Sequence, residues 1–190
     1  LTMVVIGLAT SMAFTSLPLV TEAVTQKRHR DLAHLINNNF QLYALLMFPA
    51  TFGMILLAYP LNTFFYEPDV LASKVLIEAC LSGLFMGLFM LTSSTLQGMY
   101  HNKAAVKFFA VGIIAKIILQ YPCILLFQIY GPLLSTTLGM ALSCYLNIRQ
   151  LQKATRFNYR LTLKRILLIA ILTLIMLIGA AITKGIFGIV

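Results

Sequence analysis

Residues 75–97 read VLIEACLSGLFMGLFMLTSSTLQ, in which Glu78 is the one charged side chain. An α-helix rises about 1.5 Å per residue, so about 20 apolar residues cross the hydrocarbon core of a bilayer. Strands of a membrane barrel are about half as long and alternate apolar with polar residues, which this stretch does not do. The segment therefore predicts a transmembrane helix.

Five further apolar runs of similar length lie along the chain, at about 1–20, 40–65, 104–127, 132–151 and 166–182. The chain is 60% hydrophobic and 10% charged, whereas soluble domains carry about 25% charged residues. This composition excludes a soluble globular domain. The sequence predicts an all-α membrane protein with six transmembrane helices. Because both ends lie in apolar sequence, we expect an internal piece of a longer protein.

Basic residues are concentrated in alternate connectors. Segments 21–37, 99–107 and 148–165 hold eleven of the fourteen Lys and Arg residues, and the opposite connectors hold only Lys74 and Lys184. An excess of this kind marks the cytoplasmic side of a membrane protein. We therefore place the three basic connectors in the cytoplasm. This also explains the net charge of +9 without a nucleic-acid partner.

The last and first basic connectors have distinct patterns. Six basic residues in the last connector are topology anchors, or alternatively bind lipid head groups: Arg149, Lys153, Arg156, Arg160, Lys164 and Arg165. The first connector, residues 22–39, places Leu32, Leu35 and Ile36 at helical spacing. That spacing predicts a short amphipathic helix at the cytoplasmic interface, after a span that ends at Pro18.

Polar and small residues form stripes within the spans. Rows of small residues favour close helix packing and occur at Gly7/Ser11, Gly83/Gly87 and Ser135/Gly139/Ser143. A water-filled substrate path is the alternative interpretation of such stripes. Its candidate residues in the third and fourth spans are Lys116, Gln120, Glu78, Ser93 and Gln97.

Helix packing alone does not explain the position of Lys116. It lies near the middle of the span 104–127, where a cation costs at least about 2.5–3.5 kcal/mol on insertion scales. Its side chain must therefore face a cavity, the bundle interior or an acidic partner. Glu78 lies one turn inside the external end of its span and is the weaker candidate.

Several features favour a transporter over an enzyme. Pro49 and Gly53 interrupt the second span and Pro122 the fourth, and broken helices are common in transporters, although also in static bundles. The sequence has no nucleotide-binding glycine motif and no zinc motif, and its Cys and His residues lack metal-ligand spacing. We expect no metal, no cofactor and no catalytic residues. A channel or a secondary transporter fits best.

Three ordered motifs resemble the MOP flippase superfamily. The first is SLPLV at 16–20, followed by the basic connector and Phe48-Pro49. The second is LQGMYHNK at 96–103, and the third is YGPLLST at 130–136 followed by Tyr145-Leu146-Asn147. The pattern is most similar to the polysaccharide-biosynthesis and MurJ-like branch, the lipid II flippases. The resemblance covers nearly the whole chain.

The resemblance implies two lobes of six helices and two further helices. Residues 1–151 would supply helices eight to twelve, and residues 152–190 a basic cytoplasmic connector and helix thirteen, which would line a groove for a lipid tail. The lobes of such proteins rock to alternate access across the bacterial cytoplasmic membrane. The implied substrate is a lipid-linked oligosaccharide, and candidate partners are membrane lipids and cell-wall synthesis proteins. A MATE-type drug/cation antiporter and a non-transporting membrane scaffold are the alternatives.

Overall fold

The computed structural model describes residues 2–65, 70–155, 166–173, 175–177 and 179. The described residues are helical apart from short turns and contain no strand. The elements are α1 (Thr2–Thr25), α2 (His29–Leu56), α3 (Ala58–Phe65), α4 (Val70–Gly98), α5 (Asn102–Phe127), the 3-10 turn η1 (Gln128–Tyr130) and α6 (Gly131–Thr155). The prediction of an all-α protein is confirmed.

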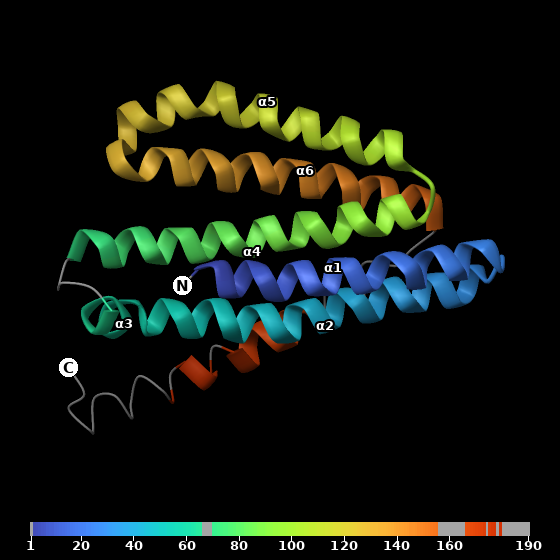
Figure 1. Cartoon of the computed structure of the whole chain (residues 1–190), viewed down its shortest axis with the longest axis horizontal. Helices are drawn as coiled ribbons and strands as arrows, with labels where there is room; N and C mark the ends of the chain where they lie inside the picture. Colours follow the sequence, from blue (N-terminus) through green and yellow to red (C-terminus); the bar gives the residue numbers. More distant parts are fainter. Residues whose placement is uncertain (1, 66–69, 156–165, 174, 178, 180–190) are drawn as a thin grey trace.

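Three described stretches have the length and hydropathy of membrane spans: Asp31–Leu56, Ala72–Gly98 and Asn102–Thr155. The last is 54 residues long and comprises α5 and α6, which Figure 1 shows folded back on each other through η1. The first predicted run corresponds to α1, which has 24 residues. In the sixth predicted span, the described residues 166–173 and 175–177 are helical and mostly apolar, and residues 174, 178 and 180–182 lie outside the described residues.

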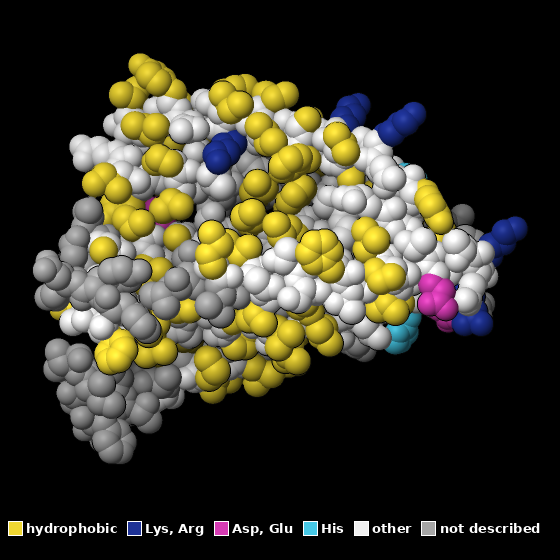
Figure 2. Space-filling model, viewed as in Figure 1, with side chains coloured by type: hydrophobic (Ala, Val, Ile, Leu, Met, Phe, Trp, Pro, Cys, Tyr) yellow, Lys and Arg dark blue, Asp and Glu magenta, His cyan; other side chains and the backbone are white. Residues whose placement is uncertain are grey.

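The helices lie side by side in the order α5, α6, α4, α1, α2, which is not their order in the chain (Figure 1). α6 therefore separates most of α5 from α4, and α1 lies between α4 and α2. The α1–α2 turn, the α4–α5 turn and the end of α6 meet at one end of the bundle (Figure 1). Lys and Arg side chains gather at this end in Figure 2, as the alternation of basic connectors predicted.

The predicted interfacial helix over residues 22–39 is wrong. Residues up to Thr25 continue α1, and α2 begins at His29. Lys27 turns the chain with a φ of 54°, and the backbone N–H of Arg28 donates to the carbonyl of Ala23 at 3.1 Å. Leu32 and Ile36 are buried in the core with Val20 of α1. The apolar face of this segment therefore packs on a neighbouring helix.

The prediction that the first span ends at Pro18 is also wrong, because α1 continues to Thr25. Pro18, Pro49 and Pro122 all lie inside continuous helices. A proline removes one backbone donor, and a long helix packed against neighbours retains its other hydrogen bonds. The break in the second span comes at Leu57, between α2 and α3.

Side-chain hydrogen bonds join the helices. Asn147 Nδ2 of α6 donates to Thr92 Oγ1 of α4 at 3.2 Å, and both side chains are fully buried. Tyr43 Oη of α2 donates to the carbonyl of Leu84 in α4 at 2.5 Å. Asn39 Nδ2 of α2 donates to Ser16 Oγ of α1 at 2.6 Å. These bonds satisfy polar groups that lipid would leave without partners.

Two of the three rows of small residues pack as predicted. A Cβ added at Gly112 would lie 1.7 Å from Ser143 Oγ, and one added at Gly139 would lie 2.7 Å from the carbonyl oxygen of Gly112. A Cβ at Gly87 would lie 2.6 Å from Cβ of Ala9. The row Gly7/Ser11 does not pack in the described part of the chain, since a Cβ at Gly7 meets no atom within 4 Å.

Replacing Gly139 with alanine tests the close approach of α5 and α6. The added methyl group would meet the backbone of Gly112 and Cβ of Lys116 at 2.7 and 2.9 Å. We expect Gly139→Ala to lower the free energy of unfolding by about 1–3 kcal/mol, the usual cost of overpacking. Thermal unfolding of the detergent-solubilised protein measures this.

The matched control is Gly53→Ala, because a Cβ there meets no atom within 4 Å. Alanine forms helix better than glycine by about 1 kcal/mol, so this variant is expected to be at least as stable as the parent. Equal stability of the two variants would contradict the close crossing.

Candidate functional site

Lys116 lies on α5 against the seam with α6. A Cβ added at Gly139 would lie 2.9 Å from Lys116 Cβ and 3.4 Å from its Cα, so the absence of a side chain at Gly139 admits the stem of Lys116. The side chain is half-buried, as is Gln120 one turn further along. Lys116 forms no ion pair in the described part of the chain. The positive charge therefore remains available to a group outside the described helices.

Glu78 lies near the start of α4. Its side chain is half-buried, and Oε2 is buried without a hydrogen-bond partner among the described residues. Lys74, one turn earlier on the same helix, is exposed and forms no ion pair with it. A buried carboxylate oxygen without a donor is costly in lipid, so Glu78 also needs a partner beyond these helices.

Ser93 and Gln97 lie at the basic end of α4. Ser93 is buried and accepts a hydrogen bond from Gln97 Nε2 at 3.2 Å, whereas Gln97 is exposed. The bond joins residues one turn apart on the same helix. Here the pair forms a local polar contact near the end of the bundle.

A stacked pair of rings shows how deep each candidate lies. Phe89 of α4 stacks on Phe109 of α5 with ring centroids 5.1 Å apart. Because the two helices are antiparallel, Glu78, eleven residues before Phe89, lies at a depth similar to that of Gln120, eleven residues after Phe109. Lys116 lies one turn closer to the middle.

The five candidates therefore fall into two groups. Lys116, Gln120 and Glu78 lie in the half of the bundle away from the basic end, and Ser93 and Gln97 lie in the other half. Fifteen residues of helix separate Glu78 from Ser93, which corresponds to about 22 Å. The described helices do not bring all five into one site.

The basic residues predicted to meet lipid head groups are described only in part. Arg149 and Lys153 lie on the last turns of α6 and are exposed. The guanidinium carbon of Arg149 lies 5.5 Å from the ring centroid of Tyr145. Arginine and tyrosine are both favoured at the membrane–water interface. The other four, Arg156, Arg160, Lys164 and Arg165, lie outside the described residues.

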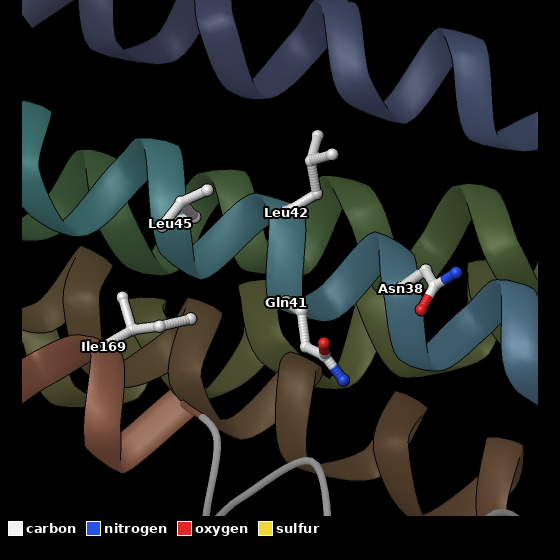
Figure 3. Close-up of a pocket in the computed structure, with 5 residues that line it drawn as sticks. All are labelled: Asn38, Gln41, Leu42, Leu45 and Ile169. Atoms are coloured by element: carbon white, nitrogen blue, oxygen red, sulfur yellow. The ribbon is translucent and has the colours of Figure 1, made fainter.

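A groove along α2 was not predicted from the sequence. One part has a cavity volume of about 420 Å³ and is lined by Asn38, Gln41, Leu42, Leu45 and Ile169 (Figure 3). The adjoining part has about 360 Å³ and is lined by Asp31, His34, Leu35, Asn38 and Asn39. Asn38 lines both parts, and we call them together the α2 groove. Both parts are open at the surface of the bundle and are not enclosed cavities.

The helical spacing of Asp31, His34, Asn38 and Gln41 was the available signal for this groove. It was missed because residues 22–39 were interpreted as an interfacial connector. The bond between Asn147 and Thr92 was also missed, because the spacing within each helix does not show which helices are neighbours. The described residues contain no group of His, Cys, Asp and Glu that could hold a metal ion.

Comparison with known proteins gives a family. The sequence profile of the family described as "Lipid II flippase MurJ" matches residues 1–188. The chain is also 30% identical over 192 aligned residues to the lipid II flippase MurJ of Bacillus subtilis (strain 168), and the match covers 99% of this chain. It covers 35% of that relative, so this chain spans about a third of the relative's length.

These findings agree with the helical architecture. MurJ proteins are multi-pass membrane transporters of the MOP superfamily, and the apolar helices described above fit a location in the bacterial plasma membrane. The resemblance seen in the sequence motifs is confirmed by the profile and by the relative. This chain belongs to the MurJ family of lipid II flippases.

Proposed function

We propose that the protein containing this chain moves a lipid-linked cell-wall precursor, lipid II, across the bacterial plasma membrane by alternating access. The observation that carries this proposal is the family match over residues 1–188. The relative from Bacillus subtilis, named as a lipid II flippase, supports it. Transport of this kind requires no covalent chemistry, so we propose that the protein is not an enzyme.

We propose that residues 1–151 form part of the C-terminal lobe, followed by the connector and helix thirteen in residues 152–190. The hydrogen bonds from α2 to α1 and α4, and from α6 to α4, support movement of these helices as one body. Alternating access is largely rigid-body rocking of one bundle against another. A bundle joined in this way is suited to rock as a unit.

The substrate carries a pyrophosphate, so its path needs cationic side chains. Lys116 is half-buried at mid-span and has no acidic partner among the described helices, which supports a role for it facing the path. Gln120 offers amide hydrogen-bonding groups one turn away. A MATE-type antiporter would need a carboxylate for its ion. Of the described carboxylates, Glu22 and Asp31 are exposed near the basic end, which leaves Glu78 as the candidate inside a span. Cell-wall synthesis proteins are proposed partners.

Depletion of the full-length protein in its own cells tests the transport function. We expect lipid II exposed on the outer leaflet to fall relative to the total pool, and precursor to accumulate inside. The measurement is the fraction of lipid II accessible from outside, with a plasmid-borne copy as the control. Unchanged exposure, with no second flippase present, would contradict the proposal and direct attention to ion-coupled efflux.

Lys116 provides a sharper test within this chain. We expect Lys116→Met to reduce lipid II exposure by about tenfold, the loss expected for one charge-assisted hydrogen bond, while the protein remains folded. Lys116→Arg keeps the charge and should retain most of the activity. Exposure of lipid II is measured in cells that contain each variant as their only copy.

Thermal unfolding of each variant separates two roles of Lys116. If its charge serves the path, Lys116→Met keeps the unfolding temperature of the parent and loses transport. If its charge serves only an ion pair with another helix, unfolding temperature and transport fall together. Normal transport by Lys116→Met would exclude both roles.

A further inference from the structure

The α2 groove changes from polar to apolar along the helix. The part near the basic end is lined by Asp31, His34, Asn38 and Asn39 together with Leu35. The part deeper in the bundle is lined by Leu42, Leu45 and Ile169 together with Asn38 and Gln41. Figure 3 shows Asn38 and Leu45 at opposite ends of this stretch, with Ile169 reaching toward Leu45 from the following helical segment. A groove with this gradient suits a molecule that has a polar head and a hydrocarbon chain.

The length of the groove matches one leaflet of a bilayer. Fourteen residues separate Asp31 from Leu45, which gives about 21 Å of helix. Half of the hydrocarbon core is about 15 Å thick, and the head-group layer adds several ångströms. Because the polar end lies at the basic, cytoplasmic end of the bundle, the occupant belongs to the cytoplasmic leaflet.

The charges beside the polar end favour an anionic head group. Arg28 Nε lies 4.0 Å from Asp31 Oδ2, and both side chains are about two-thirds exposed, at 65% and 67%. The positive charge of Arg28 thus offsets the negative charge of Asp31, which lines the groove. Lys27, the residue before Arg28, is exposed and adds a further positive charge. His34 Nδ1 lies 3.2 Å from Asn38 Nδ2, which leaves the other ring nitrogen of His34 for a ligand. Arginine, histidine and amide groups together suit a phosphodiester with hydroxyl groups.

We propose that the α2 groove binds one anionic phospholipid of the cytoplasmic leaflet. Its phosphate contacts Arg28 and His34, its head-group hydroxyls contact Asn38, and one acyl chain lies along Leu42, Leu45 and Ile169. A phospholipid fits better than the lipid-linked precursor, because the groove is confined to one leaflet. The proposal does not depend on the transport function.

Native mass spectrometry of the full-length protein tests the site. The protein is stripped of lipid in mild detergent and titrated with phosphatidylglycerol or with zwitterionic phosphatidylcholine. We expect one phosphatidylglycerol to bind in preference to phosphatidylcholine. Leu45→Trp fills the apolar part and should weaken this binding by about tenfold. Leu46→Trp is the matched control, because Leu46 is exposed on α2 and does not line the groove.

A second pair of variants tests the head group. Arg28→Gln should reduce the preference for phosphatidylglycerol over phosphatidylcholine by about tenfold, as loss of a charge-assisted hydrogen bond predicts. Lys107→Gln removes an exposed basic residue near the start of α5, at the same end of the bundle, and should leave the preference unchanged. The unfolding temperature of every variant is measured, and the pair Leu46→Trp and Lys107→Gln sets the range expected for folded protein.

Three results would overturn the proposal. The first is equal binding of the two phospholipids by the parent protein. The second is unchanged phosphatidylglycerol binding by folded Leu45→Trp and Arg28→Gln. The third is displacement of phosphatidylglycerol by undecaprenyl pyrophosphate at a concentration below that of phosphatidylglycerol, together with weaker binding of undecaprenyl pyrophosphate to Leu45→Trp. This result would assign the groove to the transported substrate.

Discussion

The hydrocarbon core of the membrane offers no hydrogen-bond partners, and this constraint governs the arrangement of the helices. Asn147 Nδ2 donates to Thr92 Oγ1 between α6 and α4 at a point that is fully buried. The Asn147 amide facing lipid would lose this acceptor, at a cost of several kcal/mol by order of magnitude. The bond therefore favours α6 beside α4, and the glycines at the α5–α6 seam then bring α5 against α6.

Lys116 links this packing to function. The absence of a side chain at Gly139 leaves room for Cβ of Lys116. The close approach of α5 and α6 therefore also determines where the side chain of Lys116 starts. The described helices contribute no carboxylate to it, and a mid-span cation is costly without an anionic or aqueous environment. The required environment therefore comes from outside the described helices. This agrees with the proposal that Lys116 faces the substrate path.

The sequence predicted the apolar helices in their chain order, because lipid imposes length and polarity on each segment separately. The second predicted span, 40–65, was misplaced, since α2 runs from His29 to Leu56 and α3 follows it. The common end of the basic connectors was predicted for the same reason. Contacts between helices were harder: Leu32 and Ile36 have the same spacing whether a helix packs on the membrane surface or on α1. Of the candidate site, Lys116 was predicted from its cost in lipid, but its place beside Gly139 depends on which helices are neighbours. The pattern within one helix does not contain that information.

The polar residues of α2 follow from the same constraint. Asn38 is exposed on a helix whose neighbouring exposed side chains include Leu42 and Leu45. An exposed carboxamide among leucines is unfavourable at the centre of a bilayer and acceptable near the head groups, where water and phosphates supply partners. The exposed side chains of Asp31, His34 and Asn38, toward the basic end, are polar, and those of Leu42, Leu45 and Leu46, beyond Gln41, are apolar. The boundary between head groups and hydrocarbon therefore lies close to Asn38. The groove therefore crosses the level at which a phospholipid itself changes from polar to apolar.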